Sequence, residues 1–120
     1  MKKFKVCITG GAGFIGSNIY AELISRGHEV FIIDDLSTGN LENLPFGATV
    51  HVKDINHIQP EDLPGVDVVF HCAALARVQM SIEQPVRYHN SNVDGTLNVL
   101  EASRKAGVKR LIYSASSSAY

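Results

Sequence analysis

The sequence lacks several features that would assign it to a specialised class of protein. It has no tryptophan and only two cysteines in 120 residues. Cys7 and Cys72 lie far apart, which excludes the close-paired spacing of a zinc site, and both fall in apolar runs typical of buried, reduced thiols in a cytoplasmic protein. No apolar run approaches the ~20 residues of a membrane span, and the first one is too short for a signal peptide. We therefore expect no metal site and no membrane partner.

The charge of the chain is nearly balanced and does not point to a particular class of partner. Eleven basic and twelve acidic residues give a formal net charge of −1, and they are spread along the chain. No basic stripe is present, so a nucleic-acid partner is not indicated. With 45% hydrophobic residues, the chain is long enough to bury a core, and its length predicts a single domain over residues 1–120.

Strand and helix signals alternate along the chain. Helical patterns cover 14–27, ending at Gly27, and 85–106, beginning at Pro85 and ending before Gly107. Short apolar runs predict five strands, at 4–9, 28–34, 48–54, 66–74 and 109–115. Because most of these runs are apolar throughout, the strands should form a parallel sheet with both faces covered. We predict a Rossmann-like, doubly wound α/β fold of strand order 3-2-1-4-5 that stops after its fifth strand.

Three further expectations concern the packing of this fold. The third strand alternates more than the others and should lie near an edge. The connection 55–65 is short for a crossover helix and should hold at most a turn or two. The helical spacing assigns the inward faces of the two helices to Ile15, Ile19 and Leu23, and to Val93, Leu97 and Leu100.

Three glycines at regular spacing lie between the first predicted strand and the first helix. Gly10 would let the chain turn sharply, Gly13 would let the backbone approach a pyrophosphate, and Gly16 would let the helix pack close to the strand. The helix N-terminus would offer N–H groups and a partial positive charge to the phosphates. The strand before and the helix after favour a dinucleotide site over a flexible turn with incidental glycines.

Acidic residues follow the next two strands. Asp34, eighteen residues beyond Gly16, could accept both ribose hydroxyls of an adenosine, or it could simply cap the loop. No Arg or Lys follows within 35–40 to hold a 2′-phosphate, which favours NAD over NADP. Asp54 could reach the adenine edge, with Ile55 against its face, but capping of the following turn is an open alternative.

These residues, with the later strands, resemble the extended short-chain dehydrogenase/reductase family, and within it the NAD-dependent nucleotide-sugar epimerases and dehydratases. The resemblance rests on TGGAGFIGS at 9–17, DDLSTG at 34–39, HCAALARVQMSIEQP at 71–85 and the stretch 90–120. It implies a cofactor site made of Gly10, Gly13, Phe14, Ile15, Gly16, Asp34, Asp35, Ser37, Thr38, Gly39, Asp54, Ile55, Ala73, Ala74, Leu75 and Asn92. Asn92 has an alternative placement on an exposed helix face, and His71 and Arg77 are interpreted as structural or groove-lining.

The resemblance also implies a catalytic hydroxyl at Ser116, with Ser117 and Ser118 facing a UDP-sugar. In such epimerases NAD takes a hydride from C4 of the sugar and returns it to the other face, and members often form homodimers. The run of three serines is similar to epimerases of N-acetylated UDP-hexosamines, such as UDP-GlcNAc and UDP-GalNAc, with UDP-glucose and UDP-galactose as the alternative substrates. The serines argue against a dehydratase, which needs acidic residues there. A decarboxylase is a further alternative within the family.

The family's Tyr-x-x-x-Lys pair does not occur in this sequence. The positions four after Tyr20, Tyr88 and Tyr113 hold Ile, Asn and Ser, and Tyr120 is the final residue. We therefore interpret the chain as the NAD-binding N-terminal portion of a 4-epimerase, without turnover by itself. The alternative is a stand-alone NAD-binding module, such as a sensor or a partner subunit.

Overall fold

A computed structural model describes residues 2–36, 40–72 and 94–113 of the chain. Its elements in chain order are β1 (Lys5–Thr9), α1 (Phe14–Ser25), β2 (Glu29–Asp34), the 3₁₀ turn η1 (Leu41–Asn43), β3 (Val50–Val52), the 3₁₀ turns η2 (Ile55–His57) and η3 (Pro60–Asp62), β4 (Val68–His71), α4 (Gly95–Ala106) and β5 (Arg110–Tyr113). None of the helices in these ranges is long and apolar enough to cross a membrane.

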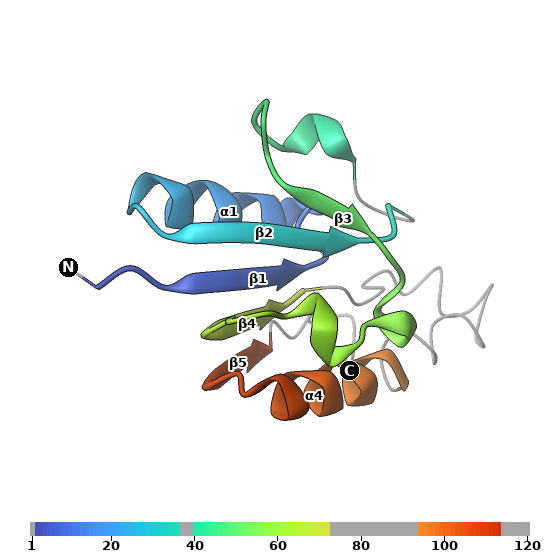
Figure 1. Ribbon diagram of the computed structural model, residues 1–120. Helices are drawn as coiled ribbons and strands as arrows, with labels where there is room; N and C mark the ends of the chain where they lie inside the picture. Colours follow the sequence, from blue (N-terminus) through green and yellow to red (C-terminus); the bar gives the residue numbers. More distant parts are fainter. Residues whose placement is uncertain (1, 37–39, 73–93, 114–120) are drawn as a thin grey trace.

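The five strands form one parallel sheet in the order β3-β2-β1-β4-β5, with α1 and α4 on opposite faces (Figure 1). This confirms the predicted doubly wound topology and the edge position of the third strand. Within the described residues each strand covers less than its predicted range, and positions 73, 74, 114 and 115 of those ranges lie outside the described residues. The helix stops are also confirmed, because Gly27 and Gly107 both adopt positive φ angles, of 85° and 81°.

Alternate residues of each strand supply two separate cores, as expected for strands covered on both faces. The core beneath α1 contains Val6, Ile8, Tyr20, Val30 and Ile32. The core beneath α4 and the 3₁₀ turns contains Cys7, Phe31, Ile33, Ile55, Ile58, Leu63, Val66, Val69, Val99 and Ala102. The side chains of β1 and β2 thus alternate strictly between the two layers, which fixes the register of the central pair.

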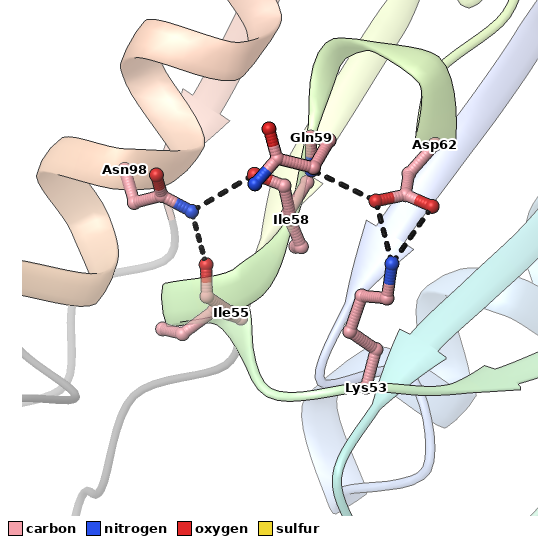
Figure 2. A network of polar contacts seen from close by, with 6 residues as sticks. All are labelled: Lys53, Ile55, Ile58, Gln59, Asp62 and Asn98. Atoms are coloured by element: carbon pink, nitrogen blue, oxygen red, sulfur yellow. Dashed lines mark hydrogen bonds and ion pairs between the residues drawn. The ribbon is translucent and has the colours of Figure 1, made fainter.

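The connection from β3 to β4 holds only η2 and η3, as predicted from its length. A network of polar contacts joins this segment to α4 and ties its two ends together (Figure 2). The Asn98 amide of α4 donates to the carbonyls of Ile55 and Ile58, at 2.6 and 3.1 Å, and the Lys53 ammonium lies 2.9 Å from Asp62 Oδ2. Side-chain hydrogen bonds and an ion pair therefore fix the position of this connection, which contains no crossover helix.

The prediction for the inner face of α1 was wrong at Ile15, which is 50% exposed. Ile19 and Leu23 do pack against the core as predicted, and Tyr20 is buried beside them. In the first turn the buried residues are instead Gly16 and Ser17. The helix approaches the glycine turn so closely there that a Cβ on Gly16 would lie 2.7 Å from Gly11 Cα, so no large side chain fits on that side.

The prediction for the inner face of α4 was also wrong. Leu97 and Leu100 are 60% and 44% exposed, and Val93 lies outside the described residues. The buried face carries Gly95, Val99, Ala102 and Ser103. Most of these residues are small, so α4 can lie close to η2 and η3. The spacing of the large apolar residues along α4 does not predict this face.

Candidate active site

Several predicted site residues gather at the carboxyl edge of the sheet, where all five parallel strands end (Figure 1). Thr9, Asp34 and His71 are the last residues of β1, β2 and β4. Each is at most 5% exposed. In open α/β sheets this edge, at the point where the strand order reverses, is where ligands bind. Here that point lies between β1 and β4.

The glycine turn joins β1 to α1 at this edge. Gly10 has a φ of 73°, which agrees with the sharp turn predicted for it. Among the described residues, a Cβ on Gly13 would meet only the Gly10 carbonyl, at 3.4 Å, so none of them closes off the space above Gly13. Gly13 is also the N-cap of α1 and offers no side-chain cap. The first turn of α1 therefore keeps N–H groups that have no intrahelical partner.

Gly11, which is not one of the three regularly spaced glycines, is also required to be glycine. A Cβ there would lie 2.6 Å from Ile32 Cγ2 and 2.8 Å from Ile32 Cδ1. Ile32 is fully buried in the core beneath α1 and cannot move aside. The only sequence signal for this role is the Gly-Gly pair itself.

Asp34 fixes the glycine turn to the end of β2. Its Oδ2 accepts the Ala12 N–H at 2.9 Å, and its Oδ1 accepts the Leu36 N–H at 2.7 Å. The second bond is the loop cap that the sequence left as an alternative. A carboxylate has about four acceptor positions, so each oxygen keeps one for a ribose hydroxyl. Leu36, with a φ of 64°, adopts a left-handed conformation rare for its type, and the Asp34 bond helps to hold it there.

Asp54 and Ile55 follow β3 at the same edge. Asp54 Oδ1 accepts the Asn56 N–H at 2.8 Å and so caps η2, which is the capping role predicted as the alternative to an adenine contact. Ile55 is 6% exposed and belongs to the core beneath α4. The geometry thus gives both residues a structural role, and their contact with adenine stays a prediction.

His71 joins three elements through its imidazole. Nδ1 lies 2.7 Å from the Thr9 hydroxyl of β1, Nε2 lies 2.9 Å from the Thr96 hydroxyl of α4, and the ring meets Tyr113 of β5 edge-on. Burial lowers the pKa of His71 to about 4, so the ring is neutral at physiological pH. The structural role predicted for His71 agrees with this geometry.

The thiols are not positioned as nucleophiles. Cys7 is fully buried, and Cys72, expected to be buried, is only half-buried because it follows the last residue of β4. Burial raises the pKa of Cys72 to about 11, and burial, with the Asp62 charge, raises the pKa of Cys7 further. Among the described residues, no group of three His, Cys, Asp or Glu side chains could hold a metal ion.

The other predicted site residues divide into two groups. Phe14, Ile15 and Asp35 are exposed at the carboxyl edge, beside the glycine turn and the end of β2. The remaining predictions lie outside the described residues: Ser37, Thr38, Gly39, Ala73, Ala74, Leu75, Asn92, Ser116, Ser117 and Ser118, together with Arg77.

Comparison with known proteins gives a consistent match. The model of the NAD dependent epimerase/dehydratase family matches residues 6–120. The chain is 41% identical over 118 residues to UDP-glucose 4-epimerase of Corynebacterium glutamicum, covering 97% of this chain and 36% of that protein. It is also 38% identical over 130 residues to UDP-N-acetyl-alpha-D-glucosaminuronate decarboxylase of Bacillus cytotoxicus, covering 100% of this chain and 38% of that protein.

Solved structures agree in fold. The UDP-N-acetylglucosamine 4-epimerase of Methanobrevibacter ruminantium, in complex with UDP-N-acetylmuramic acid, superposes with a TM-score of 0.88 at 40% identity, covering 98% of this chain and 39% of that one. UDP-glucose 4-epimerase of Thermus thermophilus, solved with NAD, gives a TM-score of 0.78 at 42% identity, covering 89% of this chain and 36% of that one. The chain thus spans less than two-fifths of the length of these four proteins.

Proposed function

The chain belongs to the NAD-dependent epimerase/dehydratase family, and we propose that it forms the NAD-binding part of a UDP-sugar 4-epimerase. One observation carries the proposal: Ala12, which directly precedes the N-cap of α1, donates its N–H to the Asp34 carboxylate, so a helix start without a side-chain cap and an acidic group are joined at the carboxyl edge, next to the switch point between β1 and β4. Helix N–H groups suit a pyrophosphate, and a carboxylate at the end of the second strand suits an adenosine ribose.

In this proposal the chain's own residues bind and orient the cofactor. Gly13 lets the backbone approach the pyrophosphate, and the first turn of α1, including Phe14 and Ile15, presents its N–H groups. Asp34 accepts the ribose hydroxyls and repels a 2′-phosphate, which selects NAD over NADP. Bound NAD supplies reversible hydride transfer at C4 of the sugar. Ser116 would hydrogen-bond the 4-oxygen of the sugar, with Ser117 and Ser118 beside the sugar.

The proposed ribose contact is tested by Asp34→Asn. The variant loses the charge and one of the acceptors, so we expect about tenfold weaker NAD binding by calorimetry, the size of one charge-assisted hydrogen bond. Asp67→Asn is a matched control, because Asp67 also accepts a backbone N–H, that of Lys5 at 2.9 Å, but at the opposite edge of the sheet. Equal NAD affinity in wild type and Asp34→Asn would exclude the ribose assignment.

The substrate is proposed more finely as an N-acetylated UDP-hexosamine, on the basis of the three consecutive serines at 116–118. A coupled assay on a form of the protein as long as its relatives, offered UDP-glucose and UDP-N-acetylglucosamine side by side, tests this. Turnover of UDP-glucose alone would contradict the preference for the acetylated sugar. Decarboxylation of a UDP-hexuronic acid without epimerisation would place the protein in the decarboxylase branch instead.

A further inference from the structure

The two peptide groups on either side of Ala12 are both held by residues at or after the end of β2. The Ala12 N–H donates to Asp34 Oδ2, as described above. The Ala12 carbonyl accepts two hydrogen bonds from the segment after β2, one from the Asn40 N–H at 3.1 Å and one from the Asn43 side-chain amide at 2.8 Å. Ala12 is fully buried, so its carbonyl needs these partners.

The Ala12 carbonyl belongs to the peptide that leads into the N-cap of α1. The N–H of that same peptide, on Gly13, donates to the Gly10 carbonyl at 3.1 Å. With both ends of the peptide bonded, its plane is fixed. The Gly13 carbonyl then accepts the Ser17 N–H at 2.9 Å and begins the helix. The direction of the first N–H groups of α1 therefore depends on how the Ala12 carbonyl is held.

The turn η1 places the Asn43 side-chain amide against the Ala12 carbonyl. Asn40 Oδ1 accepts the Glu42 N–H at 2.9 Å and caps η1, and no residue of η1 is buried. Leu41 is 52% exposed. Because η1 itself contributes so little burial, the bonds to Ala12 are important for its position.

We propose that Asn43 is a positioning residue for the cofactor, which fixes the Ala12–Gly13 peptide so that the first N–H groups of α1 point at the pyrophosphate. The inference rests on the proposed NAD site. It is independent of any contact between Asn43 and the cofactor. Since coupling between two sites is reciprocal, NAD binding should in turn hold η1 more firmly.

Three variants test the role of Asn43. Asn43→Ala removes the donor, and Asn43→Asp keeps the shape but places an acceptor against the carbonyl. Glu42→Gln is the matched control, because Glu42 is an exposed residue of the same turn. We expect calorimetry to give about tenfold weaker binding of NAD and of ADP for Asn43→Ala, a larger loss for Asn43→Asp, and a change within about twofold for Glu42→Gln.

Two further readouts separate positioning from general stability. Adenosine lacks the pyrophosphate, so its affinity, measured by NMR titration, should be equal in wild type and Asn43→Ala. Hydrogen exchange of residues 40–46 should slow when NAD binds wild type and should respond less in Asn43→Ala.

Four other outcomes would overturn the inference, and each points to a different cause. Equal NAD affinity in wild type and Asn43→Ala would overturn it alone, and so would an equal loss for NAD and adenosine, which would indicate general destabilisation. Undiminished slowing of exchange at 40–46 in Asn43→Ala would show direct contact with NAD instead of coupling through Ala12. A wild type that binds no NAD would overturn the proposed function, and the inference with it.

Discussion

The glycines of the turn between β1 and α1 serve different physical purposes. Gly10 is needed for its positive φ, whereas Gly11 and Gly16 are needed because a Cβ would meet Ile32 or the backbone of the turn itself. Gly13 differs from all three, because its φ of −78° suits any residue and its Cβ would make only an ordinary contact. No contact within the described residues requires glycine at this position, whereas the proposed approach of a pyrophosphate to the backbone would require it.

This difference predicts that substitution of Gly11 mainly lowers stability, whereas substitution of Gly13 mainly weakens cofactor binding. Gly11→Ala should lower the free energy of unfolding by about 1–3 kcal/mol, because it overpacks the core at Ile32. Gly13→Ala should change it by less than about 1 kcal/mol, since a poorer N-cap is offset by a stiffer unfolded chain. Urea unfolding measures both, and calorimetry should show weaker NAD binding for Gly13→Ala. A Gly13→Ala variant with unchanged affinity would contradict the predicted approach of the pyrophosphate.

At the residue scale, the sequence predicts what depends on local geometry. The spacing of Gly10, Gly13 and Gly16 between a strand and a helix was sufficient to locate the turn. The requirement at Gly11 was missed because it depends on where the Ile32 side chain packs. The bond from Asn43 to Ala12 was missed for the same reason, since it joins residues 31 positions apart. Such contacts exist only once the sheet has brought the segments together.

Among the elements, His71 joins β1, β4 and α4 beneath the carboxyl edge. A neutral imidazole has one donor and one acceptor nitrogen, and the hydroxyls of Thr9 and Thr96 can match either arrangement. The Thr9 contact, at 2.7 Å, is buried, and an unmatched group there would cost about 1–3 kcal/mol; the Thr96 contact, at 2.9 Å, is partly buried. The network therefore sets the position of α4 relative to the end of β1, where the glycine turn begins.

The burial of His71 predicts a loss of stability in mild acid. Its pKa in the folded protein is about 4, below the 6.5 of an ordinary histidine, so the unfolded chain binds the proton more tightly. The contribution of neutral His71 is complete above pH 6.5 and is lost as the pH falls toward 4, by about 3 kcal/mol in total. Urea unfolding of wild type and His71→Gln between pH 7.5 and 4 measures it. Parallel pH profiles for the two proteins would contradict the assignment.

The two helices show why element faces were harder to predict than element order. Strand order follows from apolar runs and from the handedness of crossovers, and it was confirmed. The inner face of α4 was assigned to Leu97 and Leu100 because apolar side chains usually face the sheet. The helix instead packs through Val99 and Ala102 onto η2 and η3, where the Asn98 amide binds two carbonyls. A polar contact with a loop therefore competes with the apolar pattern.

At the scale of the whole molecule, the two ends of the sheet differ in chemistry. An apolar groove of about 330 Å³ lies at the amino end of β4 and β5, lined in part by Phe4, Val68, Phe70 and Ile112. The carboxyl end instead gathers Asp34, the glycine turn and the uncapped start of α1. A dinucleotide carries two phosphates and needs donors for them, so the proposed site lies at the carboxyl end and the groove is unrelated to it.

The 120-residue chain should therefore bind NAD without turning over a sugar nucleotide. Binding to the folded state alone at a hundredfold excess over the dissociation constant adds about 2.7 kcal/mol, which for a domain of this size raises Tm by about 10 °C. Asp34→Asn should reduce that shift at the same NAD concentration. We expect no conversion of UDP-glucose or UDP-N-acetylglucosamine in a coupled assay, because no tyrosine of the sequence has a lysine four positions on to lower its pKa. Measurable conversion by this chain would show that another group removes the sugar's hydroxyl proton, and the absence of any thermal shift would contradict the NAD site itself.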